Sequence, residues 1–254
     1  MTAFEELFSA ARFAHDKFRF LLLVFELSDK RQHVAMYRHD MPGLVKSFVD
    51  AVPTHRVSTQ VVKIDPLPGL RLAAACEGLA NTVYSACEVA ASFACKASNG
   101  KVSSSFNAYR NNVKKGTHDG SLVGGLGNFE WYERIREIRT EWTHHSTIFI
   151  GVKDGSPVLV VKPLRRQKDR IQLPEKTLVS VDDLIAWSGR AIIVLDCFAL
   201  EVYKRFVLPG IDLDLHVYEP VMNRDGFPIM RPDGGMETRR ITIRECLRCV
   251  GFDV

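Results

Sequence analysis

The pattern of hydrophobic and polar positions along the chain predicts a mainly helical protein. Five segments repeat their apolar residues at steps of three and four, the period of a helix with one buried face. These segments are residues 3–28, 70–98, 103–115, 128–145 and 182–208. We expect Ser104 or Ser105 to cap the third helix and Asp182-Asp183 to cap the last, and we expect Pro42-Gly43 to break the chain after the first.

Shorter segments in which apolar and polar residues alternate predict β-strands. They are residues 57–64, 147–152, 157–162, 177–181 and 213–221. Lys153-Asp154-Gly155-Ser156 is expected to form a hairpin turn between the second and the third. Near the C-terminus, Thr242-Ile243-Arg244-Glu245 has the form of a capping box and is expected to open a short final helix. We expect no internal repeat.

These elements predict a mainly α fold. We expect a helical bundle over residues 1–208, interrupted by a small β-rich insertion at about 147–181. Residues 209–254 follow as a C-terminal appendage of mixed α+β character. A chain of 254 residues is long enough to bury a substantial core without disulfides or metals.

Composition adds limits on function. The chain is 46% hydrophobic and 25% charged, with a formal net charge of +4, which is ordinary for a soluble protein and too mildly basic to indicate nucleic-acid binding by itself. Its six cysteines lie mostly among apolar neighbours, as reduced cysteines of a cytoplasmic protein do. Cys246 and Cys249 form a lone C-x-x-C without a second ligand pair, so we expect no metal site. We expect no cofactor and no membrane contact.

The segment 128–145 carries the candidate chemistry. Arg139, His144 and His145 lie outside or at the end of an apolar stripe that is expected to be buried. The stripe consists of Trp131, Ile135, Ile138 and Trp142. Metal-free RNA cleavage needs a histidine to transfer protons and an arginine to stabilise the charge that builds on the phosphate. Arg139 and His144, with His145 as a second histidine, are therefore the candidate catalytic residues.

Helical geometry restricts this hypothesis. Five residues of ideal helix rotate a side chain by about 140°, so Arg139 and His144 point to different sides of one helix. They meet a shared phosphate only if the helix ends near Trp142-Thr143, or if two chains pair and each contributes one residue. In the alternative interpretation, His145 is a buried core residue and His144 forms a surface ion pair with a neighbouring glutamate.

An arginine followed at this spacing by a histidine, near the end of a late helix, resembles the motif of the HEPN superfamily (higher eukaryotes and prokaryotes nucleotide-binding). The resemblance covers roughly residues 66–208 by element order. It implies a helical bundle that forms a homodimer, cleaves RNA without metal at two copies of the motif and, in toxin or defence systems, pairs with an antitoxin protein. This sequence departs from the motif at Thr140, where the family often has Asn, Asp or His.

Two further groups of residues are candidates for an RNA-binding surface. The first is a polar ribbon on the long alanine-rich helix, expected to line a cleft beside Arg139: Glu77, Asn81, Tyr84 and Glu88. The second is cationic and suits RNA phosphates: Arg136, Arg165, Arg166, Lys168 and Arg170. The alternatives are that the ribbon faces solvent or forms structural ion pairs, and that the basic cluster is an exposed loop.

The sequence thus supports two functions. The first is a metal-independent endoribonuclease of the HEPN type. The second is a non-catalytic helical module of the same fold that binds a nucleotide or a protein partner. Whether Arg139 and His144 converge in an open cleft, or are held in ion pairs, distinguishes the two.

Overall fold

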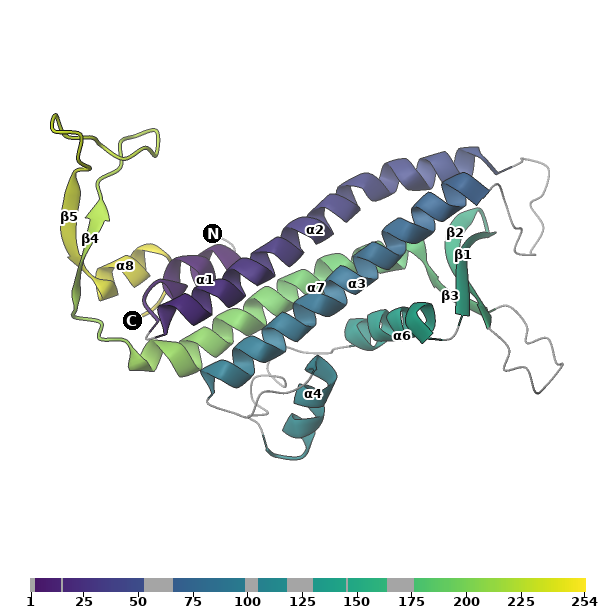
Figure 1. The fold of residues 1–254 in the computed structure, drawn as a ribbon, viewed down its shortest axis with the longest axis horizontal. Helices are drawn as coiled ribbons and strands as arrows, with labels where there is room; N and C mark the ends of the chain where they lie inside the picture. The colour runs from purple at the N-terminus through teal and green to yellow at the C-terminus, as the bar shows by residue number, and fades with distance from the viewer. Residues whose placement is uncertain are drawn as a thin grey trace.

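The computed structural model describes most of the chain as a helical body with small β-elements at its two ends (Figure 1). The described residues are 3–14, 16–52, 66–98, 105–117, 130–144, 146–163 and 176–254. Its helices are α1 (Ala3–Ala11), α2 (Lys17–Asp50), α3 (Pro66–Ala97), α4 (Phe106–Lys114), α6 (Glu130–His144), α7 (Val181–Val202) and α8 (Ile243–Cys249). Its strands are β1 (Ser146–Lys153), β2 (Ser156–Pro163), β3 (Lys176–Ser180), β4 (His216–Pro220) and β5 (Thr238–Thr242). The predicted mainly α class with a small β insertion is confirmed.

The body is organised around α2, α3 and α7, which lie side by side (Figure 1). Both α2 and α3 place buried residues at heptad spacing, which keeps one seam facing the neighbouring helix over many turns. In α2 the buried residues seven apart are Phe20, Leu27, Val34, Met41 and Phe48. In α3 the steps alternate between four and three along Leu72, Cys76, Leu79, Val83, Ala86, Ala90, Phe93 and Ala97.

The expected break at Pro42-Gly43 is wrong, because α2 continues through both residues to Asp50. A proline inside a helix costs roughly 3 kcal/mol. Met41 and Phe48 on the two sides of it are buried against the body, and each such side chain contributes roughly 1.5–3 kcal/mol. Packing therefore offsets the local penalty of the proline. The sequence signal for a continuous helix was the recurrence of apolar residues every seven positions on both sides of Pro42.

The single helix expected over residues 3–28 is also wrong, since the chain turns between α1 and α2. The turn lets α1 pack against both α7 and the first part of α2. Leu7, Ala10 and Ala11 of α1 are buried in this packing. The Tyr203 hydroxyl at the end of α7 donates to the carbonyl oxygen of Ala10, which fixes the short helix in place.

The β-rich insertion is a three-stranded antiparallel sheet in the order β1-β2-β3. Asp154 and Gly155 both have positive φ angles, 51° and 80°, as the predicted two-residue hairpin turn requires. The strand expected over residues 57–64 lies outside the described residues. The cap of α7 is Ser180, which accepts from the backbone N–H of Asp183, so the predicted capping by Asp182-Asp183 is wrong by two residues.

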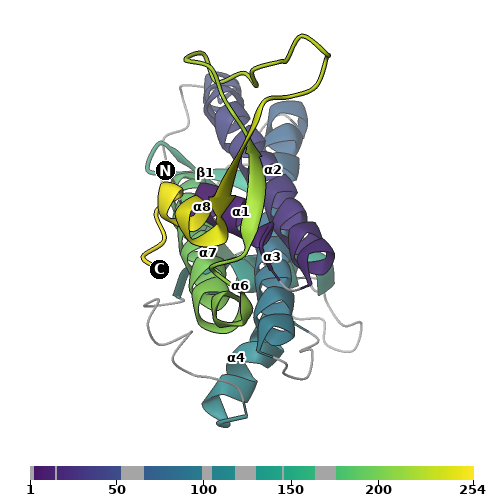
Figure 2. The same cartoon turned by 90° about the vertical axis from the view of Figure 1, so that its left-hand side faces the viewer.

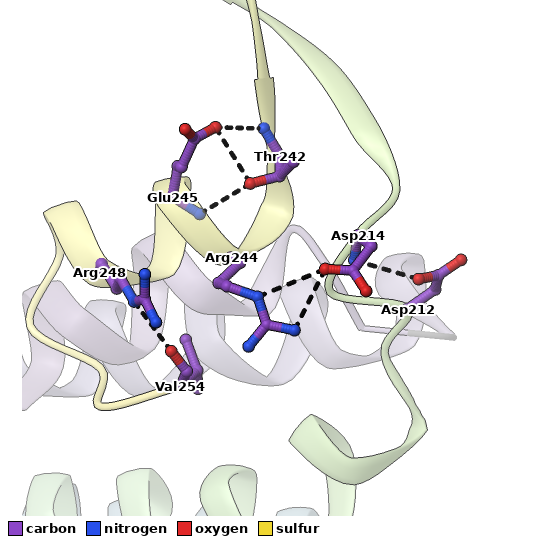
Figure 3. Close-up of polar contacts among 7 residues, drawn as sticks. All are labelled: Asp212, Asp214, Thr242, Arg244, Glu245, Arg248 and Val254. Carbon is purple, nitrogen blue, oxygen red and sulfur yellow. Dashed lines mark hydrogen bonds and ion pairs between the residues drawn. The ribbon is translucent and has the colours of Figure 1, made fainter.

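The C-terminal segment forms a separate small assembly at the end of the body opposite β1–β3 (Figure 1). Strands β4 and β5 pair antiparallel, and α8 follows directly. The predicted capping box is confirmed, because Thr242 Oγ1 accepts from Glu245 N at 3.2 Å and the Glu245 carboxylate accepts from Thr242 N at 2.7 Å (Figure 3). Arg244 pairs with Asp214 at 3.1 Å in the same region (Figure 3).

The expectation of no internal repeat is wrong for the connection between β4 and β5. Residues 220–227 read PVMNRDGF and residues 228–235 read PIMRPDGG, an eight-residue repeat with Asp-Gly at equivalent positions. Gly226 and Gly234 both have a φ of 82°, a conformation that glycine adopts without strain. The repeat therefore folds as two successive turns.

Candidate functional site on the Arg139 helix

Helix α6 is held against α3 and α7 by the predicted apolar stripe. Trp131, Ile135 and Ile138 are buried, and Trp142 is half-buried against the same core. Tyr132 is buried as well, so the covered face is wider than the stripe alone. This packing fixes which side chains of α6 face α3.

Arg139 lies on the ring of Tyr84 from α3. Its Cζ is 4.5 Å from the ring centroid, within the range of a cation–π contact. The Tyr84 ring in turn stacks on the Tyr132 ring, with centroids 6.1 Å apart and planes 17° apart. Cation–π contacts of this kind contribute about 0.5–2 kcal/mol.

Two polar atoms are buried behind these rings. Glu88 uses Oε2 to accept from the backbone N–H of Phe106 at 3.2 Å, which ties α3 to the start of α4. Its Oε1 and the Tyr132 hydroxyl are buried without a hydrogen-bond partner among the described residues. Burying a polar group in this way costs free energy.

The tyrosines of this cluster are neutral. Burial raises the pKa of Tyr84, the Glu88 carboxylate raises it further, and the Arg139 guanidinium acts in the opposite direction. Burial, followed by the proximity of Tyr84, raises the pKa of Tyr132 as well. Both phenols therefore keep their protons at neutral pH.

A second cluster joins α4 to α6. Glu133 accepts hydrogen bonds from Arg110 of α4 and from Arg136 one turn along α6, the latter at 2.9 Å. Burial raises the pKa of Glu133, but the two arginines lower it by more, and the net shift is downward. Arg110 also lies over the Tyr132 ring at 5.2 Å. Arg136, expected to bind nucleic acid, is therefore engaged in an ion-pair network on the protein itself.

The four residues of the polar ribbon lie in two environments. Glu77 and Asn81 are exposed, whereas Tyr84 and Glu88 are half-buried beneath α6 and α4. Of the four, Tyr84 touches Arg139 and Glu88 binds α4. The ribbon therefore crosses from solvent into a helix interface.

His144 is the last residue of α6. The helix extends to His144, so by ideal geometry the backbone positions of Arg139 and His144 are about 140° apart around its axis. Of the two arrangements that would let Arg139 and His144 share a phosphate, an end of the helix near Trp142-Thr143 is therefore not the one observed, since α6 extends to His144. The His144 side chain, His145 and the cluster of Arg165, Arg166, Lys168 and Arg170 lie outside what the structure describes.

Sequence patterns missed three residues of the site: Arg110, Tyr132 and Glu133. Each is close in sequence to an aromatic residue whose burial the apolar pattern predicted. Only the packing of α3 and α4 on α6 brings the three residues together. A tyrosine directly after Trp131, on the side of the stripe, was the available signal for Tyr132. Nothing in the sequence pairs Glu133 with Arg110.

Within the described residues, no group of three or more His, Cys, Asp or Glu side chains is placed to hold a metal ion. All six cysteines are free thiols. Helices of the length and apolar character needed to cross a membrane are absent from the described part of the chain. No family model, no curated protein and no solved structure matches this chain.

Proposed function

We propose that this protein is a metal-independent endoribonuclease in which α6 supplies both catalytic side chains. Arg139 binds the scissile phosphate and stabilises its developing charge. His144 transfers the proton between the ribose 2′-hydroxyl and the leaving oxygen, and His145 is the second histidine of the motif. The products end in a 2′,3′-cyclic phosphate. The resemblance of the motif to that of the HEPN superfamily supports the same assignment.

The observation that carries the proposal is the placement of Arg139 on Tyr84. The Arg139 Cζ lies 4.5 Å from the centroid of the Tyr84 ring. An arginine held by a cation–π contact still has N–H groups that can donate to a phosphate. The contact with Tyr84 therefore supports a role for Arg139 in phosphate binding.

The length of α6 supports a site built from two chains. Because Arg139 and His144 lie on different sides of one helix, a shared phosphate is reached by Arg139 of one protomer and His144 of its partner. Two such protomers related by a two-fold axis form two equivalent sites. The cytoplasm, where RNA is abundant and thiols stay reduced, is the compartment that suits six free cysteines.

The second candidate function is a binding module without catalysis. It is favoured by the ion pairs of Arg136 and Arg110 with Glu133, which occupy two of the cations beside Arg139. In that case the surface around Arg139 holds a nucleotide or an acidic protein, such as an antitoxin, and RNA is left intact.

The test is incubation of the purified protein with total RNA in excess EDTA. Arg139→Ala and His144→Ala are each expected to lower the cleavage rate by about 10²-fold or more. Arg134→Ala on the same helix and His39→Ala on the exposed face of α2 are the matched controls and should cleave as wild type does. Wild-type cleavage by both Arg139→Ala and His144→Ala would refute the assignment. Retained RNA binding without cleavage by any variant would favour the binding module.

A further inference from the structure

A β-arm made of residues 216–242 projects from the end of the body (Figures 1 and 2). Its base is the antiparallel pair β4–β5, and its tip is the two-turn repeat of residues 220–235. The arm lies at the end of the molecule opposite the β1–β3 sheet (Figure 1).

The backbone of the arm is well organised by hydrogen bonds. Val221 N donates to Glu237 O, Ile229 N to Val221 O and Glu237 N to Ile229 O, all at 2.8–2.9 Å, which closes a ring of three bonds at successive eight-residue intervals. Asn223 Oδ1 accepts from two backbone N–H groups in the first turn, and Asp233 Oδ1 accepts from Gly235 N in the second. The tip therefore has a defined shape without a hydrophobic core beneath it.

The base of the arm is anchored to the body through Glu219. Its carboxylate pairs with Arg12 of the α1–α2 turn at 2.7 Å and with Arg239 of β5 at 3.6 Å. Cys246 of α8 donates to the same carboxylate at 3.1 Å. The arm is thus held in a fixed direction rather than attached by a single strand.

The apolar side chains of the arm are on its outside. Tyr218, Met222, Phe227, Met230 and Met236 are 47–72% exposed. Met230 pairs with Met236 across the second turn, and Met222 pairs with Pro228 across the first. Exposed methionines and aromatics on a rigid projection are typical of protein-docking surfaces.

The charge of the arm argues against RNA as its ligand. Residues 216–242 contain four arginines and four carboxylates, so their formal charges cancel (4 − 4 = 0). A surface that follows an RNA backbone needs an excess of positive charge. The arm is therefore suited to an apolar protein surface.

This chain has such a surface at the same end, on α1 and α2. Phe18, Leu22 and Phe25 follow the three/four step along the outer face of α2, and all are more than half exposed. Phe8 of α1, also exposed, contacts Phe25 edge-to-face with centroids 5.3 Å apart. The arm base and α1 lie at this end of the molecule (Figure 2).

We propose that two copies of this chain associate by reciprocal exchange, the arm of each packing on the α1–α2 aromatic face of the other. At about 200 Å² for a fully exposed large apolar side chain, the five arm residues and four helix residues expose on the order of 1,000 Å² per copy. A stable protein interface covers about 800 Å² per partner, so the exchange supplies enough area for a lasting dimer. Because each copy uses both its arm and its aromatic face in the same pair, no surface is left to bind a third copy.

The proposal is tested by measuring mass in solution with light scattering. The arm variant Phe227→Asp/Met230→Asp and the face variant Phe18→Asp/Leu22→Asp are each expected to halve the mass found for the wild type. Ile193→Asp, which places one carboxylate at an exposed apolar position of α7, should keep the wild-type mass. A far-UV circular dichroism spectrum like that of the wild type establishes for each variant that the fold is intact.

Cross-linking identifies the surface that the arm touches. A photoreactive phenylalanine analogue at position 227 in ¹⁵N-labelled protein, mixed with unlabelled protein, is expected to link the labelled arm to unlabelled peptides from residues 3–31. Three results would overturn the proposal. They are a wild type with the mass of a single chain, an arm variant or face variant that keeps the wild-type mass, and cross-links from position 227 to segments outside residues 3–31. RNA cleavage by the arm variants separates this contact from the α6 site. Arm variants with the mass of one chain that still cleave RNA would refute the two-chain α6 site and leave the arm contact standing, whereas arm variants that keep the wild-type mass would refute the arm contact alone.

Discussion

The α6 site and the β-arm are opposite kinds of surface. Around α6, aromatic rings are buried and polar atoms are buried with them, including Glu88 Oε1 and the Tyr132 hydroxyl. On the arm, backbone hydrogen bonds hold the two turns in shape and the large apolar side chains face solvent. Folded proteins usually bury apolar groups and hydrogen-bond the polar groups that they bury, and each region departs from one half of this rule. The α6 site therefore suits polar chemistry inside the body, and the arm suits an apolar partner outside it.

The sharpest contrast between the two regions is expected from the same substitution made in each. Phe106→Ala removes a ring that is buried among Tyr132 and Phe198, and it should lower the free energy of unfolding by about 3–5 kcal/mol. Phe227→Ala on the arm removes an exposed ring and should change it by no more than about 0.5 kcal/mol in the monomer. Urea denaturation at low protein concentration measures both, and equal losses would contradict the contrast.

The next effect comes from a buried carboxylate in the body. Asp196 of α7 pairs with Arg31 of α2 at 2.7 Å, and its burial, opposed by Arg31, raises its pKa from 3.8 to about 6. Because the folded state binds the proton more tightly, stability should fall as the pH rises from about 4 to 6, by on the order of 3 kcal/mol. Asp196→Asn should abolish this slope. An Asp196→Asn variant that keeps the wild-type slope in urea titrations at pH 4, 5, 6 and 7 would refute the assignment.

A smaller effect is expected where the arm joins α8. Thr242→Ala removes the side chain that caps this helix and should cost about 1 kcal/mol, whereas Thr242→Ser keeps the oxygen and should cost only part of it. Hydrogen exchange of the α8 amides reports the local opening. Faster exchange in both variants to the same extent would show that the hydroxyl oxygen is not what stabilises the helix.

The smallest effect distinguishes two buried tyrosines. The Tyr132 hydroxyl is buried without a partner among the described residues, so Tyr132→Phe should be neutral or stabilise by up to about 1 kcal/mol. The Tyr203 hydroxyl donates to Ala10 O, so Tyr203→Phe should destabilise by about 1 kcal/mol or more. Melting curves that move in the same direction for both variants would show that a partner satisfies Tyr132.

Much of the fold was predictable because its signals are local. The stripe from Trp131 to Trp142, the Asp154-Gly155 turn and the Thr242–Glu245 capping box each depend on residues within a few positions of one another. The course of α2 through Pro42 was not predicted, since the local rule for proline is overridden by burial of Met41 and Phe48 on another helix.

The site was only partly predictable, because it combines local patterns with contacts between different helices. Periodicity indicated that Tyr84 belongs to a polar ribbon, and a ribbon that faces Arg139 was one of the two interpretations. It could not indicate that Tyr132 stacks on Tyr84, or that Arg110 binds Glu133, because these contacts depend on how α3, α4 and α6 pack together. Which face of a helix is buried can be read from sequence, whereas which element covers that face cannot.

The central claim is that Arg139 and His144 of different chains form one RNA-cleaving site. The most direct measurement mixes inactive Arg139→Ala and His144→Ala proteins, allows the subunits to exchange and assays RNA cleavage in EDTA. Each mixed dimer then holds one intact site, so we predict recovery of about a quarter of the wild-type rate, from half of the dimers with one of two sites each. A mixture as inactive as its two components would contradict the account.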